Sequence, residues 1–272
     1  MSTLRKKLQA AAVGFALLGS ASAFATTITN TAGTFADWGG FDWAANGLAI
    51  VEGYDALNPA GDSFTLTYYA KAAQLLNSTG GIEGMLGANI GILSNNFEYT
   101  IRVILQETSS CTTFAGFCTA ATFATTAGSF EVFYDTSADS VRTTGAGFTD
   151  GTLLIEGTIP AQASGGFDVI TGGSATIQGE VTFTSALINP SLLGTTATST
   201  LQLGETVTNF VMPTSMVGDN GGTKALPGGA LVFQADANQD FTATPVPEPG
   251  TLALAGLAML GIGFSRFRRS NV

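Results

Sequence analysis

The sequence contains no histidine, only two cysteines and few charged residues. Charged side chains make up 11% of the 272 residues, against roughly 25% in typical soluble proteins. Without histidine the chain lacks the usual general base and cannot form a Ser-His-Asp triad. It also lacks a phosphate-binding loop, zinc-ligand spacing and a dinucleotide fingerprint. We therefore expect a protein that is not an enzyme, although the twenty acidic residues leave carboxylate-pair chemistry on glycosides open.

The charges are divided by region. Three basic residues lie near each end, at positions 5–7 and at Arg266, Arg268 and Arg269, whereas all 20 acidic residues lie between Asp37 and Glu248. The part between the ends holds 4 basic and 20 acidic residues, and hence a net charge of −16. Such an acidic surface argues against nucleic acid or anionic lipid as a partner. It fits calcium, a cationic polymer or simple solubility, and solubility is the general explanation.

Residues 1–25 have the three parts of a secretory signal peptide. The positive segment 5–7 is followed by an apolar segment, 10–18, and by small residues that end in Ala23-Phe24-Ala25. This A-x-A pattern predicts cleavage after Ala25, and Ala23 is an alternative site. Because the apolar segment is short for a membrane span, a permanent anchor is the less favoured interpretation.

The other end of the chain also has three parts. A Pro247-Glu248-Pro249 motif precedes an apolar run over residues 251–264, and the basic cluster described above follows the run. The run is about 21 Å long as a helix, shorter than the roughly 30 Å hydrocarbon core of a bilayer. The arginines would stay in the cytoplasm by the positive-inside rule, and their long stems reach the interface. We therefore expect a transmembrane sorting helix that occupies the inner membrane transiently.

This end resembles the PEP-CTERM sorting signal of Gram-negative bacteria. The resemblance covers about residues 245–269 and includes Pro247, Glu248 and Pro249, the apolar run and the arginine cluster. It implies recognition by an exosortase, a membrane transpeptidase or protease, after export through the inner membrane. It also implies a destination at the cell surface or in the extracellular matrix. The three motif residues would then be recognised by another enzyme and would not form an active site of this chain.

Between the two ends the sequence predicts a β-rich secreted domain. Alternating apolar and polar residues predict strands, of which the clearest are 63–68, 97–103, 129–132, 152–159, 175–183 and 230–233. Glycine pairs predict turns, at 80–81, 165–166, 172–173 and 221–222. In the strand 97–103 the pattern places Tyr99 and Ile101 on a buried face, and Glu98 and Arg102 on a wet face. Segment 70–76 is compatible with a short helix.

Many strands with frequent turns, and no long amphipathic helix, predict an all-β fold. We expect a β-sandwich or jelly-roll-like domain flanked by an N-terminal signal helix and the C-terminal sorting helix. The predicted parts of the chain are the signal peptide 1–25, the β-rich domain 26–241, a proline-rich spacer with the PEP motif 242–250, the transmembrane sorting helix 251–264 and a basic cytoplasmic tail 265–272.

Cys111 and Cys118 are the only cysteines. An exported chain passes through an oxidising compartment, where such a pair normally closes. The six intervening residues exclude a redox C-x-x-C motif, and a chain without histidine offers few further metal ligands. We therefore expect a disulfide that staples a hairpin loop.

Both tryptophans offer a candidate glycan contact. Trp38 and Trp43 lie beside Asp37 and Asp42, and aromatic rings next to carboxylates can stack on sugars and bind their hydroxyls. The more common alternative is that the indoles fill the core.

Asp236, Asn238 and Asp240 have the D-x-N-x-D spacing of a calcium loop. An EF-hand also requires glycine at the sixth position and glutamate at the twelfth, where this chain has Phe241 and Pro247. The segment is therefore either a looser calcium site or a solvated turn. Apart from calcium, we expect no cofactor.

Three further stretches extend the resemblance. They are residues 37–43, 226–230 and 232–239, and with the sorting tail they resemble the flocculation-associated PEP-CTERM proteins of floc-forming bacteria. This resemblance implies a non-catalytic protein that retains exopolysaccharide around cells and promotes aggregation in flocs and biofilms. The alternatives are a carbohydrate- or calcium-binding adhesin and, third, a secreted glycan-active enzyme.

Overall fold

The computed structural model describes residues 26–57, 61–85, 97–204 and 210–242. These residues form strands, turns and loops, and none of them is helical. Within this part of the chain no helix is long and apolar enough to cross a membrane. The predicted signal peptide, with Ala25, and the predicted sorting tail lie outside the described residues. The all-β prediction is therefore confirmed for the part of the chain that the structure describes.

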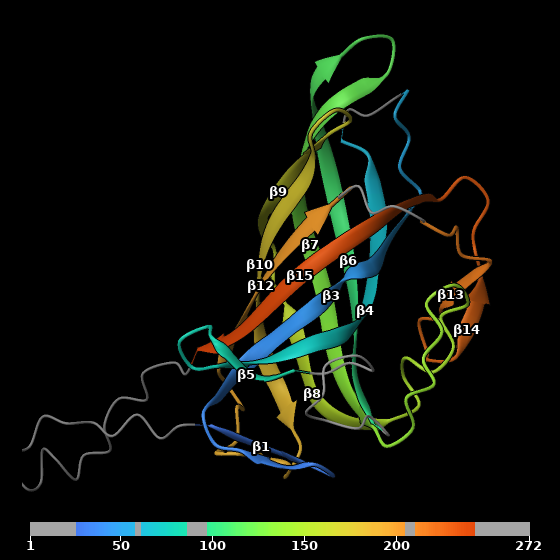
Figure 1. The fold of residues 1–272 in the computed structure, drawn as a ribbon. Helices are drawn as coiled ribbons and strands as arrows, with labels where there is room; N and C mark the ends of the chain where they lie inside the picture. The colour runs from blue at the N-terminus through green and yellow to red at the C-terminus, as the bar shows by residue number, and fades with distance from the viewer. Residues whose placement is uncertain (1–25, 58–60, 86–96, 205–209, 243–272) are drawn as a thin grey trace, which may run out of the picture.

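Eight long strands form one closed antiparallel barrel (Figure 1). They are β3 (Trp38–Glu52), β4 (Ser63–Asn77), β6 (Glu98–Phe114), β7 (Cys118–Asp135), β8 (Thr152–Ile159), β10 (Gly172–Thr184), β12 (Thr196–Leu203) and β15 (Leu231–Thr242). Each pairs with the next in this order, and β15 pairs with β3 over nine registered positions, so the sheet has no free edge here. The predicted sandwich or jelly roll is wrong, because strand pairing runs around one sheet and never divides into two.

A ninth strand lies between β7 and β10, in the same position of the barrel as β8 but along a different part of their length. β9 (Gln162–Asp168) follows β8 after Pro160, which has no N–H to donate to a ladder. β7 pairs with β8 along residues 128–134 and with β9 along residues 120–125. β10 pairs with both strands in the same way. The glycine pair 165–166 therefore lies inside a strand, and the turn predicted there is wrong.

Short strands cover parts of the barrel. β1 (Thr27–Asn30), β2 (Gly33–Phe35) and β11 (Ile188–Asn189) form a small sheet at one end, where Ile28 is fully buried. β5 (Ile82–Met85) pairs with β4. β13 (Ser215–Val217) and β14 (Thr223–Ala225) form a hairpin at the side of the barrel (Figure 1).

The β13–β14 hairpin and the loop before β8 cover the outside of β3 and β4. Met216 and Val217 are fully buried there, and Tyr69 packs edge-on against Phe148 with ring centroids 4.9 Å apart. The covered surface extends to β6, where Arg102 is only 8% exposed. The expectation of a wet outer face at Glu98 and Arg102 is therefore wrong, because a distant segment of the chain packs over it.

Most predicted strands are confirmed. Segments 63–68, 129–132, 152–159 and 175–183 lie in β4, β7, β8 and β10, whereas 97–103 begins one residue before β6 and 230–233 one residue before β15. Segment 70–76, considered as a short helix, belongs to β4. There it is paired with β3, β5 and β6, and this pairing overrides local propensity.

Candidate functional site

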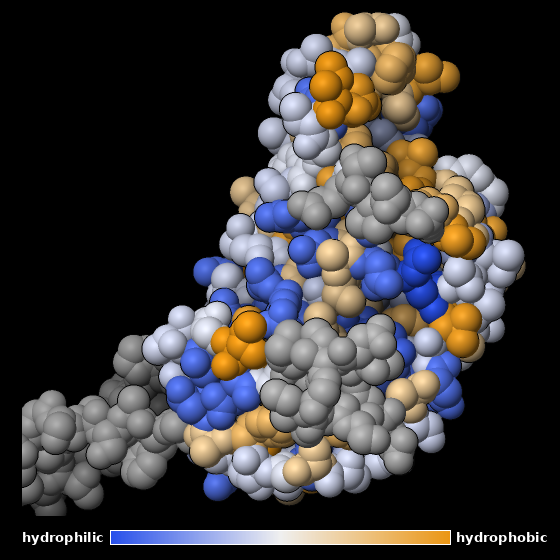
Figure 2. Space-filling model, viewed as in Figure 1, coloured by the Kyte–Doolittle hydropathy of each residue, from blue (hydrophilic) through white to orange (hydrophobic). Residues whose placement is uncertain are grey.

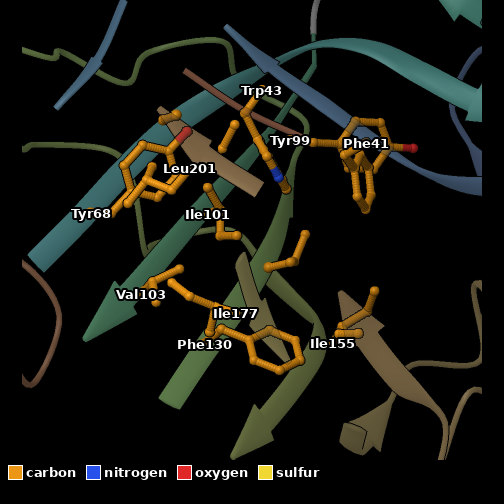
Figure 3. Close-up of a cluster of buried hydrophobic side chains, with 14 of the residues drawn as sticks. Phe41, Trp43, Tyr68, Tyr99, Ile101, Val103, Phe130, Ile155, Ile177 and Leu201 are labelled. Carbon is orange, nitrogen blue, oxygen red and sulfur yellow. The ribbon is translucent and has the colours of Figure 1, made fainter. Parts of the chain in front are cut away.

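Aromatic side chains fill one end of the barrel interior. Trp38 and Trp43 are each 1% exposed, and their ring centroids lie 5.1 and 4.9 Å from that of Phe41. Tyr99 reaches the same cluster from β6, as Figure 3 shows. Because both indoles are enclosed, neither presents a face that could stack on a sugar. The structure thus places both candidate glycan contacts in the core.

A small cavity lies beside Trp43 in the middle of the barrel. Its volume is about 20 Å³, which is room for one water molecule and not for an organic ligand. The indole N–H of Trp43 and the hydroxyl of Tyr68 have no hydrogen-bond partner among the described residues, and both residues line this cavity (Figure 3). Burial, with smaller effects of Asp236 and Asp42, raises the pKa of Tyr68 far above its usual value. This phenol therefore stays protonated.

A second cavity, which we call the mouth cavity, lies at the other end of the barrel. Its volume is about 160 Å³ and its walls are almost entirely apolar. Val51 lines it, whereas Trp38 at the opposite end of the same strand belongs to the aromatic cluster. The side walls are built by Phe64, Leu66, Phe123, Phe167, Leu203 and Phe233. The aromatic walls form two pairs, Phe64 with Phe123 and Phe167 with Phe233, with centroids 5.4 and 5.0 Å apart.

The disulfide-linked hairpin, together with Tyr54 and Ala56 after β3, forms the roof of the mouth cavity. Cys111 and Cys118 are bonded, with Cα atoms 5.8 Å apart, so the predicted disulfide is confirmed. The backbone N–H of Cys118 donates to the carbonyl oxygen of Ala56 at 2.8 Å and ties the two segments together. Burial raises the pKa of Tyr54, and the carboxylates of Asp62 and Asp55 add to the effect. These two carboxylates place negative charge at the rim beside the cavity.

A buried carboxylate lies in the wall near the mouth cavity. Glu107 is 3% exposed and pairs in the ladder with Phe64, whose ring lines that cavity. The hydroxyls of Ser164 and Thr125 donate to its Oε1 at 2.8 and 3.1 Å. Burial raises the pKa of Glu107, and these two hydrogen bonds oppose the shift. The group is a hydrogen-bonded part of the wall.

The outer face of β10, β12 and β15 carries polar side chains in register. Alternate residues of a strand point outward, and here every outward position along three cross-strand rows is polar. The first row is Ser174, Gln202 and Asp236, the second Thr176, Thr200 and Asn238, and the third Gln178, Thr198 and Asp240. We call these nine residues the polar lattice. All are exposed or half-buried, and Figure 2 shows hydrophilic residues gathered over β15 and β3.

The lattice continues at both sides. Asn238 pairs with Asp42 of β3, whose pKa is raised by burial and by the charge of Asp236. On the other side Ser174 and Thr176 border an open groove across β6, β7 and β9. The groove is floored at Gly165 and further lined by the hydroxyl residues Thr108, Ser110 and Thr122. The polar surface thus covers much of one side of the barrel.

The structure places the three candidate calcium ligands in this lattice. Asp236, Asn238 and Asp240 lie at alternate positions of β15, an extended strand. Alternate residues of a strand are about 6.7 Å apart, so the three side chains form a column along the surface instead of surrounding one ion. The D-x-N-x-D pattern therefore marks the outward face of a strand and not a loop.

A different acidic cluster brings carboxylates together. Oxygen atoms of Asp135, Asp139 and Asp150 lie within 4.8 Å of one another after β7 and before β8. Burial and the charges of Asp139 and Asp135 raise the pKa of Asp150. The backbone N–H of Ser137 donates to Asp135 at 2.8 Å, as in a solvated turn. We assign no metal to this cluster.

Several predicted site residues lie outside the described part of the chain. These are the cleavage residue Ala25, the motif residues Pro247, Glu248 and Pro249, and the basic residues Arg266, Arg268 and Arg269. Sequence reasoning missed the mouth cavity and the polar lattice. The lattice had a signal in part, since polar residues recur at every second position of β12 and of β15 from residue 234 onward, although Ser199 and Gln239 interrupt the apolar positions between them. The cavity had none, because its walls come from distant strands.

The fold and its surfaces define a β-barrel protein with a polar outer face and an apolar mouth cavity. Residues 245–269 match the family model described as the PEP-CTERM protein-sorting motif. A search of curated proteins and a search of solved structures returned no match. The chain thus carries a PEP-CTERM sorting motif, which implies export to the cell envelope or surface and processing by exosortase.

Proposed function

We propose that the exported protein is a non-catalytic component of the extracellular matrix that associates with exopolysaccharide and thereby promotes cell aggregation. The polar lattice is the observation that carries this proposal. Its hydroxyl, amide and carboxylate groups supply donors and acceptors at regular intervals, about 4.8 Å between strands and about 6.7 Å along them. Sugar hydroxyls need such partners at every residue of a polymer.

The arrangement suits many weak contacts better than one tight site. Side chains such as Thr198, Thr200 and Gln202 repeat along one strand, with no enclosed pocket among them. A repeating polymer can engage several such positions at once, so that weak contacts add through high effective concentration. The sorting motif supports the same role, because it addresses the protein to the envelope or surface where such polymers occur.

The negative charge of the lattice disfavours acidic polysaccharides as partners. Asp236 and Asp240 are part of it and Asp42 borders it. Burial raises the pKa of Asp42 and of Asp240. Carboxylates in this position repel acidic sugars and attract amino sugars. We therefore propose a neutral or amino-sugar polymer as the partner.

A co-sedimentation assay with exopolysaccharide from the native host tests the proposal. The lattice variant carries Thr198→Ala, Thr200→Ala and Gln202→Ala on β12. The matched control carries Gln106→Ala, Ser129→Ala and Thr158→Ala, which are exposed positions on other strands. We expect the wild-type and control proteins to bind equally, and the lattice variant to bind at least tenfold more weakly. Equal binding of the lattice variant would refute this assignment of the surface.

A further inference from the structure

We propose that the mouth cavity binds a small apolar group of about the size of a benzene ring, carried by a molecule without negative charge. This inference concerns the barrel interior and is independent of the polysaccharide proposal.

The mouth cavity is large enough to hold a ligand. Protein interiors are close-packed, and voids much larger than a water molecule are few. A volume of about 160 Å³ is eight times that of the cavity beside Trp43. An engineered apolar cavity of about 150 Å³ in another protein stays dry and takes up benzene. The mouth cavity therefore has room for one aromatic ring, or for an alkyl chain of about six carbons.

The walls of the mouth cavity are chemically suited to an apolar group. Five phenylalanine side chains line the cavity, four of them in two edge-to-face or tilted pairs, together with aliphatic side chains. Such walls offer dispersion contacts and edge-to-face packing to an apolar group. They offer few hydrogen bonds, so a sugar or a free amino acid would lose its hydration without compensation.

The mouth cavity is accessible from solvent through partly exposed lining residues. Three residues that line the cavity are themselves partly exposed, namely Phe117 at 45%, Val169 at 51% and Leu231 at 40%. Ile170, next to this rim, is 89% exposed, and Phe114 in the disulfide-linked hairpin is 59% exposed. Figure 2 shows hydrophobic residues at this projecting end of the molecule. The apolar cavity is thus continuous with an apolar rim through which a ligand can enter.

Carboxylates lie at the rim of the mouth cavity. Burial raises the pKa of Tyr54, which lines the cavity, and the nearby charges of Asp62 and Asp55 add to this shift. Their charges disfavour a carboxylate at the entrance, as in a fatty acid. A neutral molecule whose polar end meets the Tyr54 hydroxyl avoids this repulsion. The rim therefore selects uncharged molecules such as alcohols or simple arenes.

Titrations of the exported protein with benzene, 1-hexanol and hexanoate test the inference. Binding is followed by calorimetry and by the NMR signals of the ligand. We expect dissociation constants on the order of 0.1–1 mM for benzene and 1-hexanol, given the efficiency that very small ligands reach. Hexanoate should bind several-fold more weakly than 1-hexanol. Hexanoate binding as tight as that of 1-hexanol would overturn the assignment of an uncharged ligand.

A pair of matched variants locates the binding. Ala121→Phe places a ring in the cavity, because Ala121 lines it and is 7% exposed. Ala127→Phe adds the same ring at an exposed position of the same strand. We expect at least tenfold weaker benzene binding in A121F and unchanged binding in A127F. If A121F does not fold by circular dichroism, Ala56→Leu in the roof serves instead. Absence of binding to the wild type, or wild-type affinity in the cavity-filling variant, would overturn the proposal.

Discussion

Replacing Arg102 by methionine tests how the β13–β14 hairpin is held on the barrel. The guanidinium of Arg102 donates through Nη1 to the backbone carbonyls of Gly218 and Asp219, the latter at 2.9 Å. Its Nε donates to Glu131 at 2.8 Å, and Nη2 contacts the same carboxylate oxygen. The side chain is 10% exposed, against 23% for that of Glu131. Arg102 thus connects β6, β7 and the hairpin turn.

The expected loss of stability follows from these contacts. Hydrogen bonds to a charged group contribute roughly 1.5–3 kcal/mol each, and removing one partner of a buried ion pair costs about 3–5 kcal/mol. Methionine keeps much of the apolar packing of the stem, and Glu131 regains some hydration because it is partly exposed. We therefore expect Arg102→Met to lower the free energy of unfolding by about 3 kcal/mol. For a domain of this size the melting temperature should fall by roughly 6–12 °C.

Urea unfolding measures the loss, and hydrogen exchange locates it. We expect amide protection to decrease over residues 215–225 before the rest of the barrel is affected. Arg142→Met is the matched control, since Arg142 lies over the ring of Phe210 at 5.8 Å and makes no ion pair among the described residues. The control should cost less than about 1 kcal/mol. A similarly small loss for R102M would refute the idea that this arginine fastens the hairpin.

Three other changes test the interior and the disulfide-linked hairpin. Burial raises the pKa of Glu107 above 4.5, so the folded state binds its proton more tightly than the unfolded state. Its ionisation then costs stability at pH 7, and the cost falls as the pH drops through the raised pKa towards 4.5. Glu107→Gln should therefore be more stable than the wild type at pH 7 and lose this advantage near pH 4.5, which urea unfolding at several pH values will show; a constant difference would contradict the burial argument. Gly47→Ala should lose about 1–3 kcal/mol in the same assay, because a Cβ there lies 2.9 Å from the Tyr68 ring, and wild-type stability would disprove that close contact. The double variant Cys111→Ser, Cys118→Ser should lose about 2 kcal/mol by loop-closure entropy, and an unchanged melting temperature would show that the hairpin tip unfolds separately from the barrel.

Sequence patterns predicted the strands well because alternation is local. In β6 the residues Tyr99 and Ile101 face the core as the period of two requires. The same pattern failed for Arg102, because the hairpin that covers it comes from residues more than a hundred positions later. It failed for Glu98 because Ser140, in the loop before β8, and Lys71 bind its carboxylate. One strand's alternation shows which residues share a face, but it does not show whether another segment covers that face.

Barrel closure was likewise beyond local patterns. The pairing of β15 with β3 joins the two ends of the domain, and a β-rich sequence with frequent turns fits a sandwich as well as a barrel.

The calcium-like spacing of Asp236, Asn238 and Asp240 has two structural explanations, a metal-binding loop or a strand. Its period of two is also that of a strand with an apolar inner face, here including Ala235 and Ala237. Extending the strand prediction beyond residue 233 would have identified this face.

Cell aggregation in the native host is the decisive test of the proposed matrix role. A strain that lacks the gene is complemented with the wild type, with the lattice variant Thr198→Ala, Thr200→Ala, Gln202→Ala, or with alanine at Pro247, Glu248 and Pro249. Aggregation and retained polysaccharide are then measured. We expect the wild type to restore both and the motif variant to fail because it is not sorted. We expect the lattice variant to reach the surface but not to restore aggregation. Full restoration by the lattice variant, or unchanged aggregation in the deletion strain, would contradict a matrix role carried by this face.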